Sequence, residues 1–137
     1  MSSINEILLI TLPHFPEENG DLTFMEVEKH VPFNIERVFV VRANSGSIRG
    51  EHAHKLCKQY LTCPYGSVEV VCDDGFNKST YILDNPKIAL MIPEGIWAHQ
   101  IYIISNSVLT VLCNRKYEPE DYIRNYDKFL NYKNKNL

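Results

Sequence analysis

Short apolar segments separated by turn residues recur along the chain. Most are five to seven residues long, and in several of them apolar and polar positions alternate, which is typical of strands that bury one face. Two such segments, residues 67–73 and 79–83, flank Asp73-Asp74-Gly75, a strong signal for a hairpin turn. The pattern predicts about nine strands, over residues 7–12, 22–28, 37–41, 59–63, 67–73, 79–83, 87–92, 100–104 and 107–113.

Many short strands at regular spacing favour an all-β sandwich or barrel. The last twenty residues differ from the rest. Residues 118–121 are acidic and contain a proline, which predicts the start of a helix. Apolar residues follow at roughly helical spacing, namely Tyr122, Ile123, Tyr126, Phe129 and Leu130. We therefore expect a short C-terminal helix packed on the barrel, with residues 131–137 fraying at the end.

The composition narrows the class of protein. A chain of 137 residues with 45% hydrophobic and 23% charged residues is typical of one globular domain, here residues 1–137, and excludes a disordered chain. Its net charge of −3 disfavours a nucleic-acid binder. The apolar runs are far shorter than the ~20 residues of a membrane span. The absence of a signal-peptide pattern and of CxxC pairs favours reduced cysteines in a cytoplasmic protein.

His52 and His54 are the most informative candidates for chemistry. Alternate residues of a strand project from the same face, so two imidazoles in a small barrel would share one cavity. Imidazole is well suited to proton transfer near neutral pH. His99 is expected on the opposite face from its neighbour Ala98. The alternative interpretation is a hydrogen-bonded pair of surface histidines.

The spacing of Gly46, His52, His54, Gln59 and Gly66 resembles the first motif of the cupins, and residues 93–98 resemble the second. The resemblance implies a double-sheet jelly-roll barrel, which agrees with the strand pattern. In metal-binding cupins the positions of Gln59 and Ala98 usually hold a glutamate and a histidine. Because both of these ligands are missing, we expect no metal and no cofactor.

The segment Arg49-Gly50-Glu51-His52-Ala53-His54-Lys55 resembles the signature of the nucleotide-sugar 3,4-ketoisomerases, a cupin family. Further similarities lie at residues 20–22, 35–38, 66–68, 73–75, 93–97 and 117–127. The resemblance implies a metal-free homodimer that moves the keto group of dTDP-4-keto-6-deoxy-D-glucose from C4 to C3 through an enediol. It also implies that a PLP-dependent aminotransferase takes the product toward 3-amino-3,6-dideoxyhexoses of surface glycans, without a stable complex between the two enzymes.

The same resemblance implies roles for particular residues. His52 would be the general base, and His54 would orient His52, relay a proton or contact the sugar. The family usually has a catalytic tyrosine at the position of Phe39, and phenylalanine transfers no proton. The role of stabilising the sugar oxygen would then pass to His54, to another tyrosine or to water. The candidates for substrate binding are Arg49, Lys55, Gln59, Arg42, Phe39 and Trp97, with Arg124 as a further cation.

Three other functions stay open at this point. A nucleotide-sugar epimerase of the cupin type would use a similar base in a similar barrel. A non-catalytic cupin that binds a sugar is favoured by Phe39, and a metal-dependent dioxygenase-type cupin would require a bound metal. The sequence leaves open the configuration at C4 of the product, the final glycan and the identity of the nucleotide.

Overall fold

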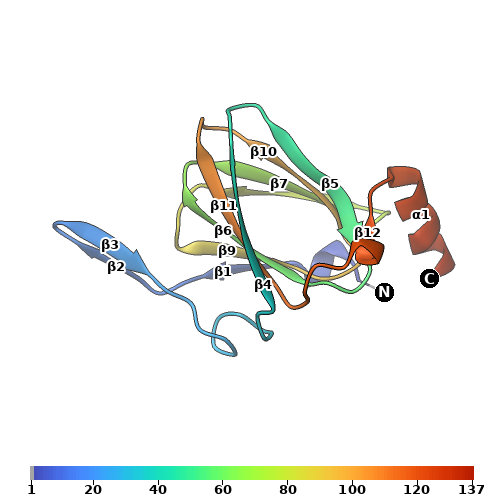
Figure 1. Cartoon of the computed structure of the whole chain (residues 1–137), viewed down its shortest axis with the longest axis horizontal. Helices are drawn as coiled ribbons and strands as arrows, with labels where there is room; N and C mark the ends of the chain where they lie inside the picture. The colour runs from blue at the N-terminus through green and yellow to red at the C-terminus, as the bar shows by residue number, and fades with distance from the viewer. Residues whose placement is uncertain (1) are drawn as a thin grey trace.

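A computed structural model describes residues 2–137 as two five-stranded antiparallel sheets that face each other, with a separate two-stranded hairpin (Figure 1). The first sheet has the order β1-β9-β6-β11-β4. Its strands are β1 (Leu8–Thr11), β9 (Ile88–Ile92), β6 (Gln59–Tyr65), β11 (Ser107–Cys113) and β4 (Arg37–Ala43).

The second sheet has the order β12-β5-β10-β7-β8. Its strands are β12 (Tyr122–Ile123), β5 (Ile48–His54), β10 (Trp97–Tyr102), β7 (Val68–Asp73) and β8 (Lys78–Leu83). The hairpin β2-β3 (His14–Glu17, Gly20–Thr23) extends away from the two sheets at the left of Figure 1. The helical segments are two 3-10 turns, η1 (Ile4–Glu6) and η2 (Pro119–Asp121), and the helix α1 (Tyr126–Lys135).

The core lies between the two sheets because their strands alternate apolar and polar positions. On β7, for example, Val68, Val70 and Cys72 are fully buried, whereas the residues between them are partly exposed. A second cluster around Tyr60 and Met91 lies against Phe33 and Ile35, which come from the loop before β4. The expected all-β, double-sheet barrel with a short C-terminal helix is confirmed, and so is the hairpin at Asp73-Asp74-Gly75.

The start of the C-terminal helix was predicted wrongly. Tyr122 and Ile123 are not helical; they form β12 and pair with His54 and Ala53 of β5. The helix begins at Tyr126, where the Asn125 side chain accepts a hydrogen bond from the Lys128 N–H and so caps the first turn. The two-residue period of a strand sends Tyr122 and Ile123 to opposite faces, which spacing alone did not reveal.

Two other expectations also need correction. The predicted strand over residues 22–28 ends at Thr23, and its partner β2 was not predicted at all. The segment 131–137 does not fray at its start, because α1 continues to Lys135. Lys133 is buried, and its Nζ donates to the backbone oxygens of Ser2 at 2.7 Å and Gly95 at 2.8 Å. Across residues 2–137, helices are too short or too polar to cross a membrane.

Gly66→Ala should destabilise the protein more than Gly46→Ala. Both glycines have a positive φ, +92° and +84°, so alanine at either position costs about 1–2 kcal/mol. A Cβ at Gly46 meets nothing within 4 Å, whereas one at Gly66 overlaps Ser107 Oγ and lies 2.8 Å from Ser107 Cα. Urea unfolding should therefore show that Gly66→Ala lowers the free energy of unfolding by about 1–3 kcal/mol more than Gly46→Ala does. Equal losses for the two variants would contradict this packing.

Candidate active site

A cavity of about 120 Å³ lies between the two sheets, lined by side chains from β4, β5, β6, β10 and β11. Its polar groups come from three strands, and the rest of its wall is apolar. The lining residues are Phe39, Val41, Arg49, Gly50, His52, Gln59, Leu61, Gln100, Leu109 and Val111. A small apolar chamber with a few convergent polar groups is typical of a site for a small molecule.

The local structure of β5 places the two histidines. His52 and His54 project to the interior, and their rings lie 5.0 Å apart between centroids at 89° to each other. Ala53, between them, is fully buried on the outer side in the cluster with Trp97 and Phe129. Gly50 has φ +88°, and a Cβ there would lie 2.8 Å from Gln100 Oε1, so this glycine permits the close approach of β10.

His54 is held by a buried carboxylate. Its Nδ1 lies 2.8 Å from Asp121 Oδ2, and the two residues are 4% and 5% exposed. Asp121 Oδ1 accepts a second hydrogen bond from the Leu56 N–H, at 2.7 Å. A carboxylate only accepts, so Nδ1 carries the proton and Nε2 presents a lone pair. Burial lowers the pKa of His54, although Asp121 acts in the opposite direction, and the ring stays neutral at pH 7.

His52 is also neutral at pH 7. Burial is the main cause that lowers its pKa to about 4, and the nearby His54, Arg124 and Arg37 act in the same direction. Its Nδ1 is buried and has no hydrogen-bond partner among residues 2–137. A neutral imidazole in the cavity wall is available to accept a proton from a bound molecule.

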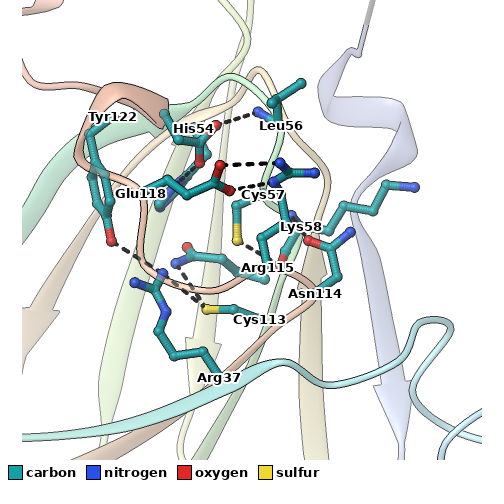
Figure 2. A network of polar contacts seen from close by, with 12 residues as sticks. Arg37, His54, Leu56, Cys57, Lys58, Cys113, Asn114, Arg115, Glu118 and Tyr122 are labelled. Carbon is teal, nitrogen blue, oxygen red and sulfur yellow. Dashed lines mark hydrogen bonds and ion pairs between the residues drawn. The ribbon is translucent and has the colours of Figure 1, made fainter.

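Tyr122 and Arg37 lie beside the histidine pair, next to the residues that line the cavity, and sequence reasoning gave neither of them a catalytic role. The Tyr122 ring lies 5.1 Å from the His52 ring and 4.3 Å from the His54 ring. Its hydroxyl accepts a hydrogen bond from Arg37 Nη2 at 3.2 Å, which joins β12 to β4 (Figure 2). The interpretation of Tyr122 as a helix packing residue was therefore wrong. The only sequence signal for it was the similarity of residues 117–127 to the family ending.

Cys113 holds two side chains near the histidine pair, Arg37 and Gln59. Its sulfur accepts a hydrogen bond from Arg37 Nη2 at 3.5 Å (Figure 2). It accepts a second one from Gln59 Nε2 at 3.9 Å. The neighbouring Cys57 thiol is the main cause that lowers the pKa of Cys113, helped by Arg37, and Cys113 in turn raises the pKa of Cys57. The sequence gave no sign of this role, because a cysteine in a strand looks like an ordinary core residue.

The donors at the cupin metal position do not fit a metal ion. Ala98 lies opposite His52 in the β10–β5 pairing and offers no ligand, and Gln59 is hydrogen-bonded to Cys113. Two imidazoles are fewer ligands than a divalent ion normally requires. A different set, His54, Cys57 and Asp121, has ligand atoms within 4.8 Å of one another, a donor combination that Zn²⁺ accepts. In that set, His54 Nδ1 and Asp121 already form a short hydrogen bond with each other.

The structure brings together five of the residues singled out from sequence. Arg49, His52, Gln59 and Phe39 line the cavity, and His54 lies next to His52. The Arg37 guanidinium carbon lies 5.5 Å from the centroid of the Phe39 ring.

Three predicted substrate contacts, namely Arg42, Trp97 and Lys55, lie outside the cavity. Arg42 is on the exposed face of β4, because the alternation that turns Phe39 inward turns Arg42 outward. Trp97 packs outside the barrel against Tyr126 and Phe129, with ring centroids 5.3 Å and 5.7 Å away, so it does not line the cavity. His99 lies on this same outer face, as expected.

Lys55 lies at a second, outer pocket of about 660 Å³ between η2, β12 and α1. Three more cations line this pocket, Arg124, Lys128 and Lys135, and no carboxylate from the described part of the chain, residues 2–137, does. Tyr122 also lines this outer pocket, and the Arg124 guanidinium carbon lies 4.3 Å from the centroid of its ring. The outer pocket therefore shares with the histidine pair a side chain that packs against both imidazoles.

Comparison with known proteins gives one consistent result. Residues 5–134 match the family described as FdtA: WxcM-like, C-terminal. The chain is 37% identical over 117 residues to a TDP-4-oxo-6-deoxy-alpha-D-glucose-3,4-oxoisomerase from Aneurinibacillus thermoaerophilus, covering 85% of this chain and 84% of that protein.

Solved structures agree with this family assignment. A 3,4-ketoisomerase from Helicobacter canadensis matches with a TM-score of 0.90 and 32% identity, over 94% of this chain and 98% of that chain. A mutant of the 3,4-ketoisomerase QdtA from Thermoanaerobacterium thermosaccharolyticum, in complex with TDP-4-keto-6-deoxyglucose, matches with a TM-score of 0.92 and 29% identity. That match covers 98% of this chain and 99% of that chain.

The depressed pKa of His52 predicts a specific dependence of stability on pH. Between its ordinary pKa of 6.5 and its folded value of about 4, the unfolded chain binds the proton and the folded chain does not. The free energy of unfolding should therefore fall as pH falls through this window. His52→Asn lacks this contribution. Between pH 7 and pH 5 the variant should therefore lose less free energy of unfolding than the wild type, by on the order of 1–2 kcal/mol.

Urea unfolding at the two pH values measures this difference. His99→Asn is the matched control, because it removes a histidine from the outer face and leaves His52 in place. The control should lose as much stability as the wild type. If His52→Asn and the control lose the same free energy of unfolding between pH 7 and pH 5, the pKa of His52 is not lowered in the folded protein.

Proposed function

The chain belongs to the FdtA family of WxcM-like C-terminal domains, and we propose that it is a cupin-type 3,4-ketoisomerase that moves the keto group of TDP-4-keto-6-deoxy-D-glucose from C4 to C3. The observation that carries the proposal is a neutral imidazole, His52, in the wall of a small cavity beside a second, carboxylate-held imidazole. The Nδ1 of His52 has no hydrogen-bond partner among the described residues 2–137. Relatives that cover nearly the whole chain carry the same activity in their names.

The residues fit the chemistry of this isomerisation. The hydrogen on C3 is acidic because it is adjacent to the C4 carbonyl, so a modest base removes it. His52 accepts this proton and an enediol forms. His52 then returns the proton to C4 as the carbonyl appears at C3. His54, kept neutral with its Nδ1–H on Asp121, supports His52 from the side and presents an acceptor nitrogen.

The substrate is bound in two zones. Gln59, Arg49 and Phe39 line the cavity and contact the sugar. Lys55 and Arg124 of the outer pocket supply positive charge for the diphosphate, because the charged side chains that line this pocket in the described chain are cations, which attract phosphate. Arg42 and Trp97 are left out of the site.

The enzyme works as a homodimer in the cytoplasm, and an aminotransferase that acts at C3 consumes its product. The four cysteines are free, which suits a reducing compartment. The β2-β3 hairpin extends from the barrel with Phe15 52% exposed and Leu22 57% exposed (Figure 1). Apolar side chains on a projecting hairpin favour coverage by a second copy of the chain.

Turnover in deuterated water tests the function directly. Incubation with TDP-4-keto-6-deoxy-D-glucose should give the 3-keto sugar with deuterium at C4, because His52 exchanges its proton with solvent before returning it. NMR of the product, after amino transfer at C3, reads both the carbonyl position and the label. His52→Asn should abolish turnover and leave the far-UV circular dichroism spectrum unchanged.

Other products would identify other functions. A product that keeps the C4 ketone with an inverted C3 or C5 would show an epimerase instead. A 3-keto product without label at C4 would show a hydride shift, and wild-type turnover by His52→Asn would show that His52 is not the base.

Charge on the hairpin should separate the dimer. Phe15→Asp and Leu22→Asp each place a carboxylate where the second copy would pack, so light scattering should show a monomer of half the wild-type mass. Phe76→Asp, at a 59% exposed position in the turn after β7, is the control and should stay dimeric. A wild-type chain that is already monomeric would contradict the dimer.

A further inference from the structure

The isomerisation needs a second proton transfer that His52 does not perform. As the carbonyl moves from C4 to C3, the oxygen on C4 gains a proton and the oxygen on C3 loses one. This requirement rests on the proposed function. The side chains that line the cavity include no hydroxyl and no carboxyl group. A side chain that moves this proton must therefore come from the residues around the cavity.

Two neighbours of His52 are unsuited to this transfer. Arg49 lines the cavity, but a guanidinium keeps its proton under all ordinary conditions, so it stabilises charge without relaying a proton. His54 has its only N–H turned to Asp121, so its free Nε2 is an acceptor and has no proton to give.

Tyr122 has the required group in the required place. Its ring contacts both His52 and His54, and its hydroxyl lies 3.2 Å from Arg37 Nη2. Because the arginine is the donor in that hydrogen bond, the phenolic proton is free to be given to another acceptor. The Arg37 guanidinium carbon also lies 5.5 Å from the centroid of the Phe39 ring, a residue of the cavity wall, so the group that binds the hydroxyl reaches toward the cavity.

Arg37 supports the phenolate form of Tyr122. Its positive charge next to the hydroxyl stabilises the negative charge that appears when the proton leaves. Cys113 fixes the guanidinium from the other side, at 3.5 Å (Figure 2). The Arg37 Nε is buried and has no hydrogen-bond partner among residues 2–137, so a donor remains for a bound oxygen.

We propose that Tyr122, held and polarised by Arg37, is the catalytic residue that carries the proton between the two sugar oxygens. While His52 removes the proton from C3, the Tyr122 O–H protonates the oxygen on C4 and leaves a phenolate beside Arg37. The phenolate then takes the proton from the oxygen on C3 as His52 delivers its proton to C4. Each residue ends in its starting state, and no oxidant or cofactor is consumed.

Steady-state kinetics of Tyr122→Phe test this role. The variant keeps the ring between the histidines and loses only the hydroxyl, so kcat should fall at least about 100-fold while KM changes little. Tyr117→Phe is the matched control. Its ring also lies 5.5 Å from the Arg37 guanidinium carbon and 5.6 Å from the Tyr122 ring, and its hydroxyl has no hydrogen bond in the described chain. The control should keep the wild-type kcat.

Rescue from a second position separates catalysis from structure. In the double variant Phe39→Tyr, Tyr122→Phe a phenol returns to the cavity wall, next to Arg37. This variant should recover at least about tenfold in kcat over Tyr122→Phe. Arg37→Met should also lower kcat, and added guanidinium ion should restore part of it. Thermal unfolding midpoints of Tyr122→Phe and of the control should agree with the wild type to within about 2 °C.

The possible results distinguish the two proposals. A wild-type chain that does not convert the 4-keto sugar overturns the proposed function and this role with it. An active wild type together with an equally active Tyr122→Phe overturns only the role of Tyr122. If Tyr122→Phe lowers both kcat and the thermal unfolding midpoint, and Phe39→Tyr does not restore kcat, Tyr122 has a structural role. That result also overturns the proposal.

Discussion

The buried carboxylate of Asp121 is the constraint on which the site depends. It accepts from His54 Nδ1 at 2.8 Å and from the Leu56 N–H at 2.7 Å, while its own backbone oxygen accepts from the Lys55 N–H at 2.9 Å. These three bonds fasten the C-terminal segment to the end of β5. A carboxylate this deeply buried is stable only when its oxygens are satisfied, so the fold and the orientation of His54 depend on each other.

The position of Tyr122 follows from the same attachment. Once Asp121 is fixed, the next two residues pair with β5, and the strand period turns Tyr122 toward the histidines and Ile123 toward α1. Arg37 then joins Tyr122 to the opposite sheet. The acid–base groups of the proposed reaction are thus held by hydrogen bonds between segments far apart in the chain, which limits their movement during proton transfer.

Burial determines the chemistry of the histidine pair. Both imidazoles are kept neutral mainly because a charge in the barrel would lose its hydration, and Arg37 and Arg124 add to this effect. The overall charge of the chain is −3, yet four cations without a carboxylate line the outer pocket beside Tyr122. The local positive charge of the outer pocket, rather than the net charge of the chain, therefore determines whether an anionic substrate is attracted to the site.

Sequence alone determined the parts that depend on local periodicity. The alternation of apolar residues predicted an all-β sandwich or barrel, and the resemblance to the cupins specified the double-sheet barrel. The spacing of two residues placed His52 and His54 on one face. The turn at Asp73-Asp74-Gly75 was equally readable, because its backbone conformation is set by the residues themselves.

Only the tertiary structure decided which distant residues meet at that face. Cys113 and Arg37 looked like ordinary strand residues, Tyr122 looked helical, and Trp97 looked as suited to the cavity as to the core. The neighbours of these side chains depend on strand pairing and on which segments cover each sheet. The contacts that result join residues far apart in the chain, such as Arg37 and Tyr122, which are 85 positions apart. A local pattern carries no information about such long-range partners, so the grouping of Arg37, Cys113 and Tyr122 beside the histidines is found only in the folded structure.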